Sequence, residues 1–166
     1  MSIQLVVCTT RAFFELLQVP DKEKKLALDA FAGFLSQTPE WANVDIENKK
    51  DYGTFDLFTK GGDILRRVVV AKSAALAEAL SHGVHIPVSC SGGHVSRKFV
   101  HSTTKGDLEL DVCDMDWLAE AVSFAGVALS DEPVSVEREL LADAVEVYGT
   151  AISLARKKVC PIFLSY

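Results

Sequence analysis

Apolar side chains recur at a helical period in three long segments of the chain. Residues 20–37 begin with Pro20, which suits the first turn of a helix, and their apolar positions follow one helix face. Residues 114–129 are apolar on nearly every side, which predicts a helix packed between other elements. Residues 135–157 keep one apolar stripe for about six turns. Three amphipathic helices are therefore predicted, at residues 20–37, 114–129 and 135–157.

Two β-rich runs follow the first of these helices. Residues 52–59 and 63–71 flank Lys60-Gly61-Gly62. Glycine supplies the positive φ that tight turns require, and the flanking runs are rich in β-branched and aromatic residues. A β-hairpin is therefore predicted over residues 52–71.

Residues 84–113 show the clearest alternation of apolar and polar side chains. The segment divides into three runs, separated by Ser91-Gly92-Gly93 and by Lys105-Gly106-Asp107. Alternation leaves one face of each run apolar and the other polar, which is typical of an antiparallel sheet. The pattern predicts a three-stranded meander over residues 84–113.

Shorter segments connect these elements. Residues 2–17 indicate a strand followed by a short helix or turn, and Ser73 is placed to cap a short helix over residues 74–81. The polar segment 38–51 is expected to be mostly loop. The apolar tail, residues 159–166, is expected to dock against the core, because an exposed version would be sticky.

The order of these elements indicates the fold class. It lacks the regular strand–helix–strand alternation of a parallel sheet. We therefore predict an α+β fold, in which a largely antiparallel sheet is packed with the amphipathic helices. A length of 166 residues with no internal repeat predicts a single globular domain, residues 1–166, with a sizeable core.

Composition narrows the classes of function. A net charge of −6 and a pI near 5.2 disfavour binding to nucleic acid or anionic membranes, which need a basic face. The chain has neither the run of about 18 apolar residues that spans a membrane nor a secretory signal. Its four cysteines are widely spaced and form no C-x-x-C pair, which predicts reduced thiols. We expect a soluble, cytoplasmic protein.

Reactive side chains concentrate between residues 82 and 101. Cys90 and His94 flank Ser91-Gly92-Gly93, and a thiol beside an imidazole can act as a nucleophile. Cys90 also continues the inward alternation of its strand, and this fits a buried, unreactive cysteine better. The spacing of the four histidines does not place them on a common face, so no metal and no other cofactor is predicted.

The segment SGGHVS, residues 91–96, resembles the SGG phosphate loop of ATP pyrophosphatases, and SGGH also occurs in certain sugar-nucleotide glycosyltransferases. In both families the loop opens a helix whose N-terminus holds phosphate. Here a β-prone run follows, and Val95 replaces the acidic residue of the pyrophosphatase motif. The two glycines therefore indicate a hairpin turn first. A small site for phosphate or carboxylate stays open as an alternative, formed by Gly92, Gly93, His94, Arg97 and Lys98.

Two hypotheses about function follow. The first is a non-enzymatic intracellular module for protein–protein interaction or assembly, which binds a protein partner or forms a homo-oligomer. It rests on the 49% hydrophobic content and on the lack of a clear catalytic constellation. The alternative is a small transferase or hydrolase that binds an anionic substrate with the Cys90–Arg97 loop and uses His94 as acid and base. For the first hypothesis, the candidate interface residues are Tyr148, Ile152, Ile162, Phe163 and Tyr166.

Overall fold

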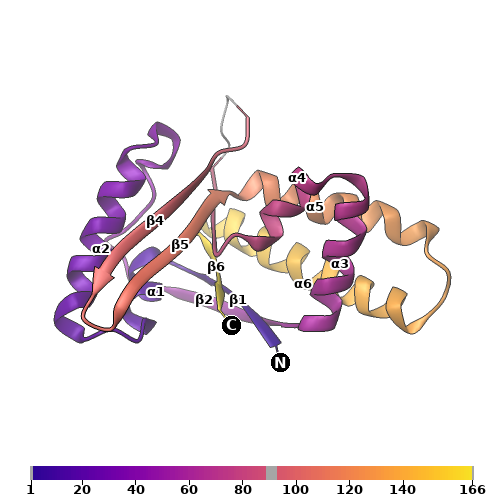
Figure 1. Cartoon of the computed structure of the whole chain (residues 1–166), viewed down its shortest axis with the longest axis horizontal. Coiled ribbons are helices and arrows are strands. Elements are labelled where there is room, and N and C mark those ends of the chain that lie inside the picture. The colour runs from indigo at the N-terminus through magenta and orange to yellow at the C-terminus, as the bar shows by residue number, and fades with distance from the viewer. Residues whose placement is uncertain (1, 89–92, 166) are drawn as a thin grey trace.

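A single mixed sheet forms the centre of the computed structural model, which describes residues 2–88 and 93–165 (Figure 1). Its strands are β1 (Ser2–Cys8), β2 (Asp51–Phe58), β3 (Val84–Ile86), β4 (Ser96–Thr103), β5 (Gly106–Asp114) and β6 (Ile162–Ser165). In the described residues their order across the sheet is β2-β1-β6-β3-β5-β4. Neighbouring strands are antiparallel except for β3 and β5. The predicted α+β class with a largely antiparallel sheet is confirmed.

Helices cover both faces of this sheet (Figure 1). One face packs against α1 (Thr10–Leu16) and α2 (Asp21–Ser36). The other face packs against a larger group, α3 (Thr59–Lys72), α4 (Ala74–Glu78), α5 (Met115–Ala128) and α6 (Val136–Lys158). Short 3-10 turns are η1 (Pro39–Trp41), η2 (Ala79–Ser81) and η3 (Leu129–Asp131). The helices predicted at residues 20–37, 114–129 and 135–157 are confirmed as α2, α5 and α6.

The central strands face two hydrophobic cores. Leu5 and Val7 of β1 belong to the core beneath α3, α5 and α6, whereas Val6 and Cys8 belong to the core beneath α1 and α2. All four side chains are buried, because successive residues of a strand point to opposite faces and helices cover both. The C-terminal tail is also buried on both faces, because β6 lies between β1 and β3 in the middle of the sheet.

Side-chain caps define the starts of three helices. Ser73, Asp114 and Ser135 accept backbone N–H groups from the first turns of α4, α5 and α6. These bonds satisfy donors that have no partner inside the helix. The cap predicted at Ser73 is thus confirmed. At its other end α6 finishes with three basic residues, which complement the negative end of the helix dipole.

The hairpin predicted over residues 52–71 is wrong in its second half. Residues 52–58 lie in β2, but the run 63–71 belongs to helix α3. The buried residues of α3 recur at helical spacing, and they pack in the core with α5 and α6. Tertiary packing on one stripe therefore outweighs the β-propensity of the valine run that ends the helix. These buried residues are Gly61, Ile64, Leu65 and Val69.

The meander predicted over residues 84–113 contains the three expected strands but not the expected pairing. β4 and β5 form an antiparallel hairpin that turns at Thr104 and Lys105. β3 is only three residues long and pairs with β5 in parallel, so it is not the first strand of a meander. The predicted turn at Ser91-Gly92-Gly93 falls mostly outside the described residues.

Candidate functional site

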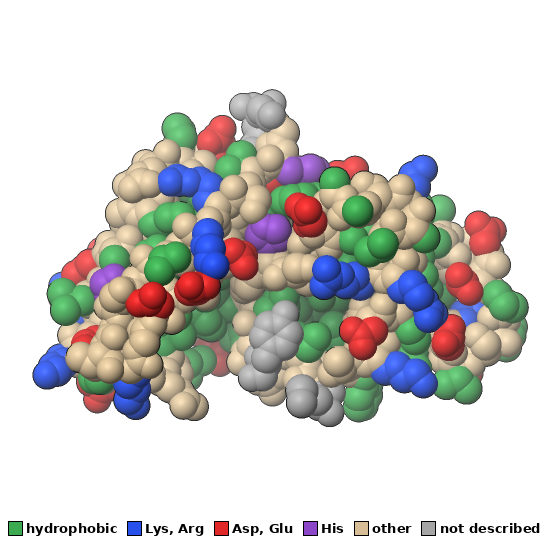
Figure 2. Space-filling view, viewed as in Figure 1, with side chains coloured by type: hydrophobic (Ala, Val, Ile, Leu, Met, Phe, Trp, Pro, Cys, Tyr) green, Lys and Arg blue, Asp and Glu red, His purple; other side chains and the backbone are tan. Residues whose placement is uncertain are grey.

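His94 lies between two carboxylates at the beginning of α5. Its Nδ1 is 3.1 Å from Asp114 Oδ1 and its Nε2 is 2.8 Å from Glu120 Oε2. Its ring stacks on the indole of Trp117, with the planes 8° apart. Partial burial lowers the pKa of His94, but the hydrogen bonds to Glu120 and Asp114 outweigh it and raise the pKa above its ordinary value. Histidine side chains reach the surface between the β4–β5 hairpin and the helices, with acidic side chains beside them (Figure 2).

The other members of the predicted anion site do not converge on His94. Arg97 reaches toward α2, where it donates to Gln37 and Thr38. Lys98 points to the opposite face of β4, as alternation in a strand requires, and pairs there with Glu109. Both cations and His94 therefore already have protein acceptors. Gly93 has a φ of +98°, which suits glycine. The remaining candidates, Cys90 and Gly92, lie outside the described residues.

The interface residues proposed from the sequence lie in the interior. Tyr148, Ile152, Ile162 and Phe163 are each at most 5% exposed and form part of the two cores. They stabilise the fold and do not present a surface to a partner. Tyr166 lies outside the described residues.

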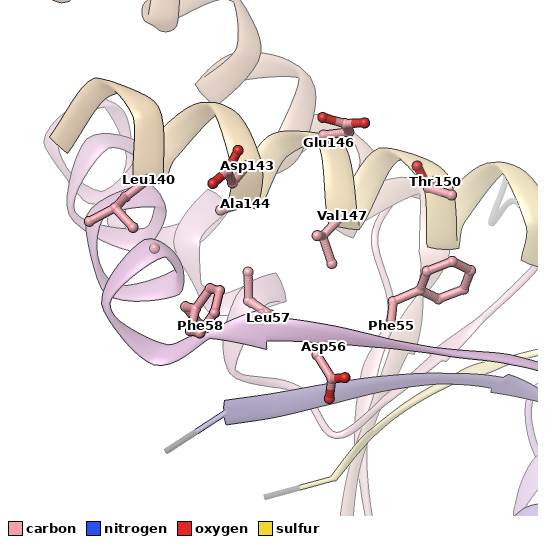
Figure 3. A pocket seen from close by; sticks show the side chains of 11 residues that line it. Phe55, Asp56, Leu57, Phe58, Leu140, Asp143, Ala144, Glu146, Val147 and Thr150 are labelled. Carbon is pink, nitrogen blue, oxygen red and sulfur yellow. The ribbon is translucent and has the colours of Figure 1, made fainter. Parts of the chain in front are cut away.

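A surface groove of about 360 Å³ runs between β2 and α6 (Figure 3). Leu57 of β2 and Val147 of α6 point toward one another across it. Phe58 stands at one end and is 71% exposed, which is unusual for a phenylalanine. Leu57 itself is only 2% exposed, so the accessible apolar surface of the groove comes from Phe58 and from half-buried residues such as Val147. The other apolar residues that line the groove are Phe55, Leu140 and Ala144.

Acidic side chains line the edge of this groove. Asp143 and Glu146 are exposed residues of α6, one turn apart. Neither carboxylate has an ion-pair partner within residues 2–88 and 93–165. Asp56 also borders the groove, but it turns away toward β1 and accepts a hydrogen bond from Gln4. The rim is therefore negatively charged, and none of the described residues that line the groove is basic.

An open sheet edge lies beside the groove. Among the described residues, β2 is the terminal strand of the sheet and pairs along its length with β1 only. The outward N–H and C=O groups of such an edge strand can pair with a further strand. A groove with a partly exposed apolar lining, an acidic rim and an open strand edge can bind an extended peptide with basic side chains.

The groove escaped the sequence analysis, although one signal of it was visible. Leu140, Ala144 and Val147 repeat at spacings of three and four residues along one border of the stripe that forms the core, to which Ala144 itself belongs. These residues widen the apolar face of the helix beyond what one core contact needs. Its position against β2 could not be foreseen, because β2 was expected to pair with residues 63–71.

Comparisons with known proteins leave the family of this chain open. No protein-family model, curated protein or solved structure gave a match. The described residues include no helix both long enough and apolar enough to cross a lipid bilayer. Nor do they place three or more histidine, cysteine, aspartate or glutamate side chains where these could hold a metal ion.

Proposed function

We propose that the protein is a protein-binding module, and that its groove between β2 and α6 binds an extended basic segment of a partner. The observation that carries this proposal is the partly exposed apolar lining of the groove next to an open strand edge. Leu57 and Val147 face each other there, and Phe58 leaves most of its ring in water. Burying apolar surface of this kind favours association by roughly 25 cal/mol for each Å² removed from water.

Charge supports a basic partner. Asp143 and Glu146 lack cationic partners within the described chain, and the whole protein carries a net charge of −6. A lysine or arginine of the partner would neutralise these carboxylates, and its long-range attraction would also speed the encounter. A second copy of this chain fits less well, because two molecules with a charge of −6 repel one another.

The edge of β2 supports an extended rather than helical partner. An added strand would pair with the backbone of β2 and place alternate side chains over the groove. Backbone pairing would supply affinity, while the apolar lining and the acidic rim would select valine-like and lysine-like side chains. The occupant we propose therefore carries both apolar and basic residues among the alternate positions whose side chains face the groove.

A direct test is titration with a synthetic eight-residue peptide in which valine, threonine, lysine and threonine repeat, so that valine and lysine share one face of the strand. Amide chemical shifts of the labelled protein report where the peptide binds. Shifts are expected in residues 52–58 and 140–150. The double variant Asp143→Lys/Glu146→Lys should weaken binding at least about tenfold, because it replaces attraction by repulsion at both positions. The same peptide with glutamate in place of lysine should not bind.

The matched control is the double variant Asp131→Lys/Glu139→Lys. It changes the net charge by the same amount at exposed positions that do not line the groove. If both double variants bind the peptide equally, or if the shifts fall elsewhere, the groove is not the binding site. Sedimentation of the free protein tests whether a second copy of the chain occupies the groove. A dimer that the groove variant disrupts and the control variant does not would show that the occupant is a second copy and not another protein.

A further inference from the structure

Ser96 and His82 meet at the opposite edge of the sheet from the groove. Ser96 begins β4 and His82 follows η2, and the Oγ of Ser96 is 2.5 Å from the Nε2 of His82. Strand pairing explains this contact between residues that are distant in the sequence. β5 pairs on one side with His85 and on the other with Ser96, through the same residue, Cys113. The start of β3 is thereby held near the start of β4.

The hydrogen bonds of His82 define its tautomer. Its Nδ1 is 2.7 Å from the backbone carbonyl oxygen of Glu78. A carbonyl oxygen can only accept, so Nδ1 carries the proton and donates it. In the neutral ring Nε2 then has a free lone pair and accepts the hydroxyl proton of Ser96. This is the arrangement a general base needs in order to activate a serine.

Access differs between the two partners in the way that catalysis requires. His82 is 8% exposed and packs against the indole of Trp117, with the ring centroids 5.3 Å apart. Its orientation is therefore fixed by packing and by the Glu78 carbonyl. Ser96 is exposed, so a reagent can reach its oxygen. An activated nucleophile requires a hydroxyl that is accessible and a base that is held in place.

Charges near the pair indicate the class of substrate. Glu120 and the buried Asp114 bind His94, whose ring stacks on the same Trp117 indole that His82 contacts. The next side chain on the same face of β4 is Lys98, already paired with Glu109. This surrounding has no unpaired cation among the described residues and would repel an anion. It favours a neutral or cationic acyl group on a small molecule that can reach an open surface.

We propose that Ser96 and His82 form a nucleophile and base pair that transfers the acyl group of a small neutral carboxylic ester to water. Ser96 Oγ bonds to the ester carbonyl carbon while its proton moves to His82 Nε2. The bond from that carbon to the leaving alcohol breaks, and the alcohol takes the proton from His82. Water then repeats the sequence in place of Ser96, releasing the carboxylic acid and restoring the serine.

The experiment uses p-nitrophenyl acetate with the full-length protein and measures acetylation at each serine by peptide mass spectrometry. Ser102 is the internal control, because it is an exposed serine of the same strand that donates to Asp107 instead of binding an imidazole. We expect native Ser96 to be acetylated at least about 100-fold faster than Ser102, the lower end of what general-base catalysis contributes. In guanidinium chloride the two serines should react equally.

Variants separate activation from mere accessibility. Ser96→Ala should abolish the burst of p-nitrophenolate, whereas Ser102→Ala should leave it unchanged. His82→Gln should reduce Ser96 acetylation about 100-fold or more while its circular dichroism stays native. If this variant does not fold, the ratio of Ser96 to Ser102 labelling in the wild type still decides. Equal labelling of the two serines in the native protein, or full labelling of Ser96 in a folded His82→Gln variant, would overturn the proposal.

Discussion

Gly61 of α3 lies against the backbone of α6 at Leu140. A Cβ placed on Gly61 would be 2.9 Å from the Leu140 carbonyl oxygen, closer than real Cβ atoms approach. Backbone cannot give way as a flexible side chain can, so the two helices would have to separate. We predict that Gly61→Ala lowers the free energy of unfolding by about 1–3 kcal/mol, the usual cost of overpacking. Urea denaturation measures this change.

Gly149 supplies the matched control on α6. It is also a helical glycine, but nothing lies within 4 Å of a Cβ placed on it. Gly149→Ala should therefore raise the free energy of unfolding by about 0.5–1 kcal/mol through helix propensity. If both substitutions have the same sign, the close approach of α3 and α6 is incorrect.

His85 should make the protein less stable in mild acid. It is fully buried, and burial lowers its pKa to about 4, although the hydrogen bond to the Ala79 carbonyl opposes this shift. Between pH 6.5 and 4 the unfolded chain therefore binds a proton that the folded chain does not. Stability should fall as the pH falls through this window, by about 3 kcal/mol near pH 4. The imidazole resonances of His85 should remain those of the neutral ring at pH 5, and a protonated ring at that pH would contradict the prediction.

His94 should make the protein slightly more stable in mild acid, which is the opposite of the effect of His85. Its pKa is raised in the folded state, because the bonds to Glu120 and Asp114 outweigh its partial burial. The stabilisation is therefore fully present below about pH 6.5, the ordinary histidine value, and disappears as the pH rises through the folded pKa. We predict that His94→Gln costs more at pH 5.5 than at pH 9, with a difference below about 1 kcal/mol because these pairs are partly exposed.

A double-mutant cycle checks that the effect comes from these carboxylates. Glu120→Gln removes the more exposed partner of His94, and it should lower the pKa of His94 measured by NMR. The cost of His94→Gln at pH 5.5 should be smaller in that background. An unchanged cost would mean that the stack on Trp117, and not the charge, stabilises this corner.

Helices were predicted well where one signal dominated. α6 has an unbroken apolar stripe, a serine that caps its first turn and basic residues in its last turn, all of which point to one element. α3 carried conflicting signals, because Gly61-Gly62 favours a turn and the valine run 68–70 favours a strand. Contact with α5 and α6 resolved the conflict toward helix, and such contact cannot be deduced from the local pattern alone.

Strand pairing was the part that sequence reasoning could not supply. The tail was expected to dock, yet nothing local indicated that β6 would enter the sheet between β1 and β3. The proximity of His82 and Ser96 depends on the parallel pairing of β3 with β5. Alternation in a strand determines which side chains share a face, but not which strands are neighbours. Candidate sites built by non-local pairing therefore emerged only from the structure.

The cysteine thiols give a last prediction, which tests burial on both faces of the sheet. Burial raises the pKa of Cys8 to about 12 and of Cys160 to about 11, and it raises the pKa of Cys113 further. Only the thiolate attacks alkylating reagents, so these buried thiols should be unreactive at pH 8. In the Cys90→Ser variant, iodoacetamide should label none of the three within an hour in buffer and all three in guanidinium chloride. Peptide mass spectrometry identifies the labelled residue. Rapid native labelling of Cys8 would mean that the core beneath α1 opens, and labelling of Cys160 would place the opening at the entry to β6.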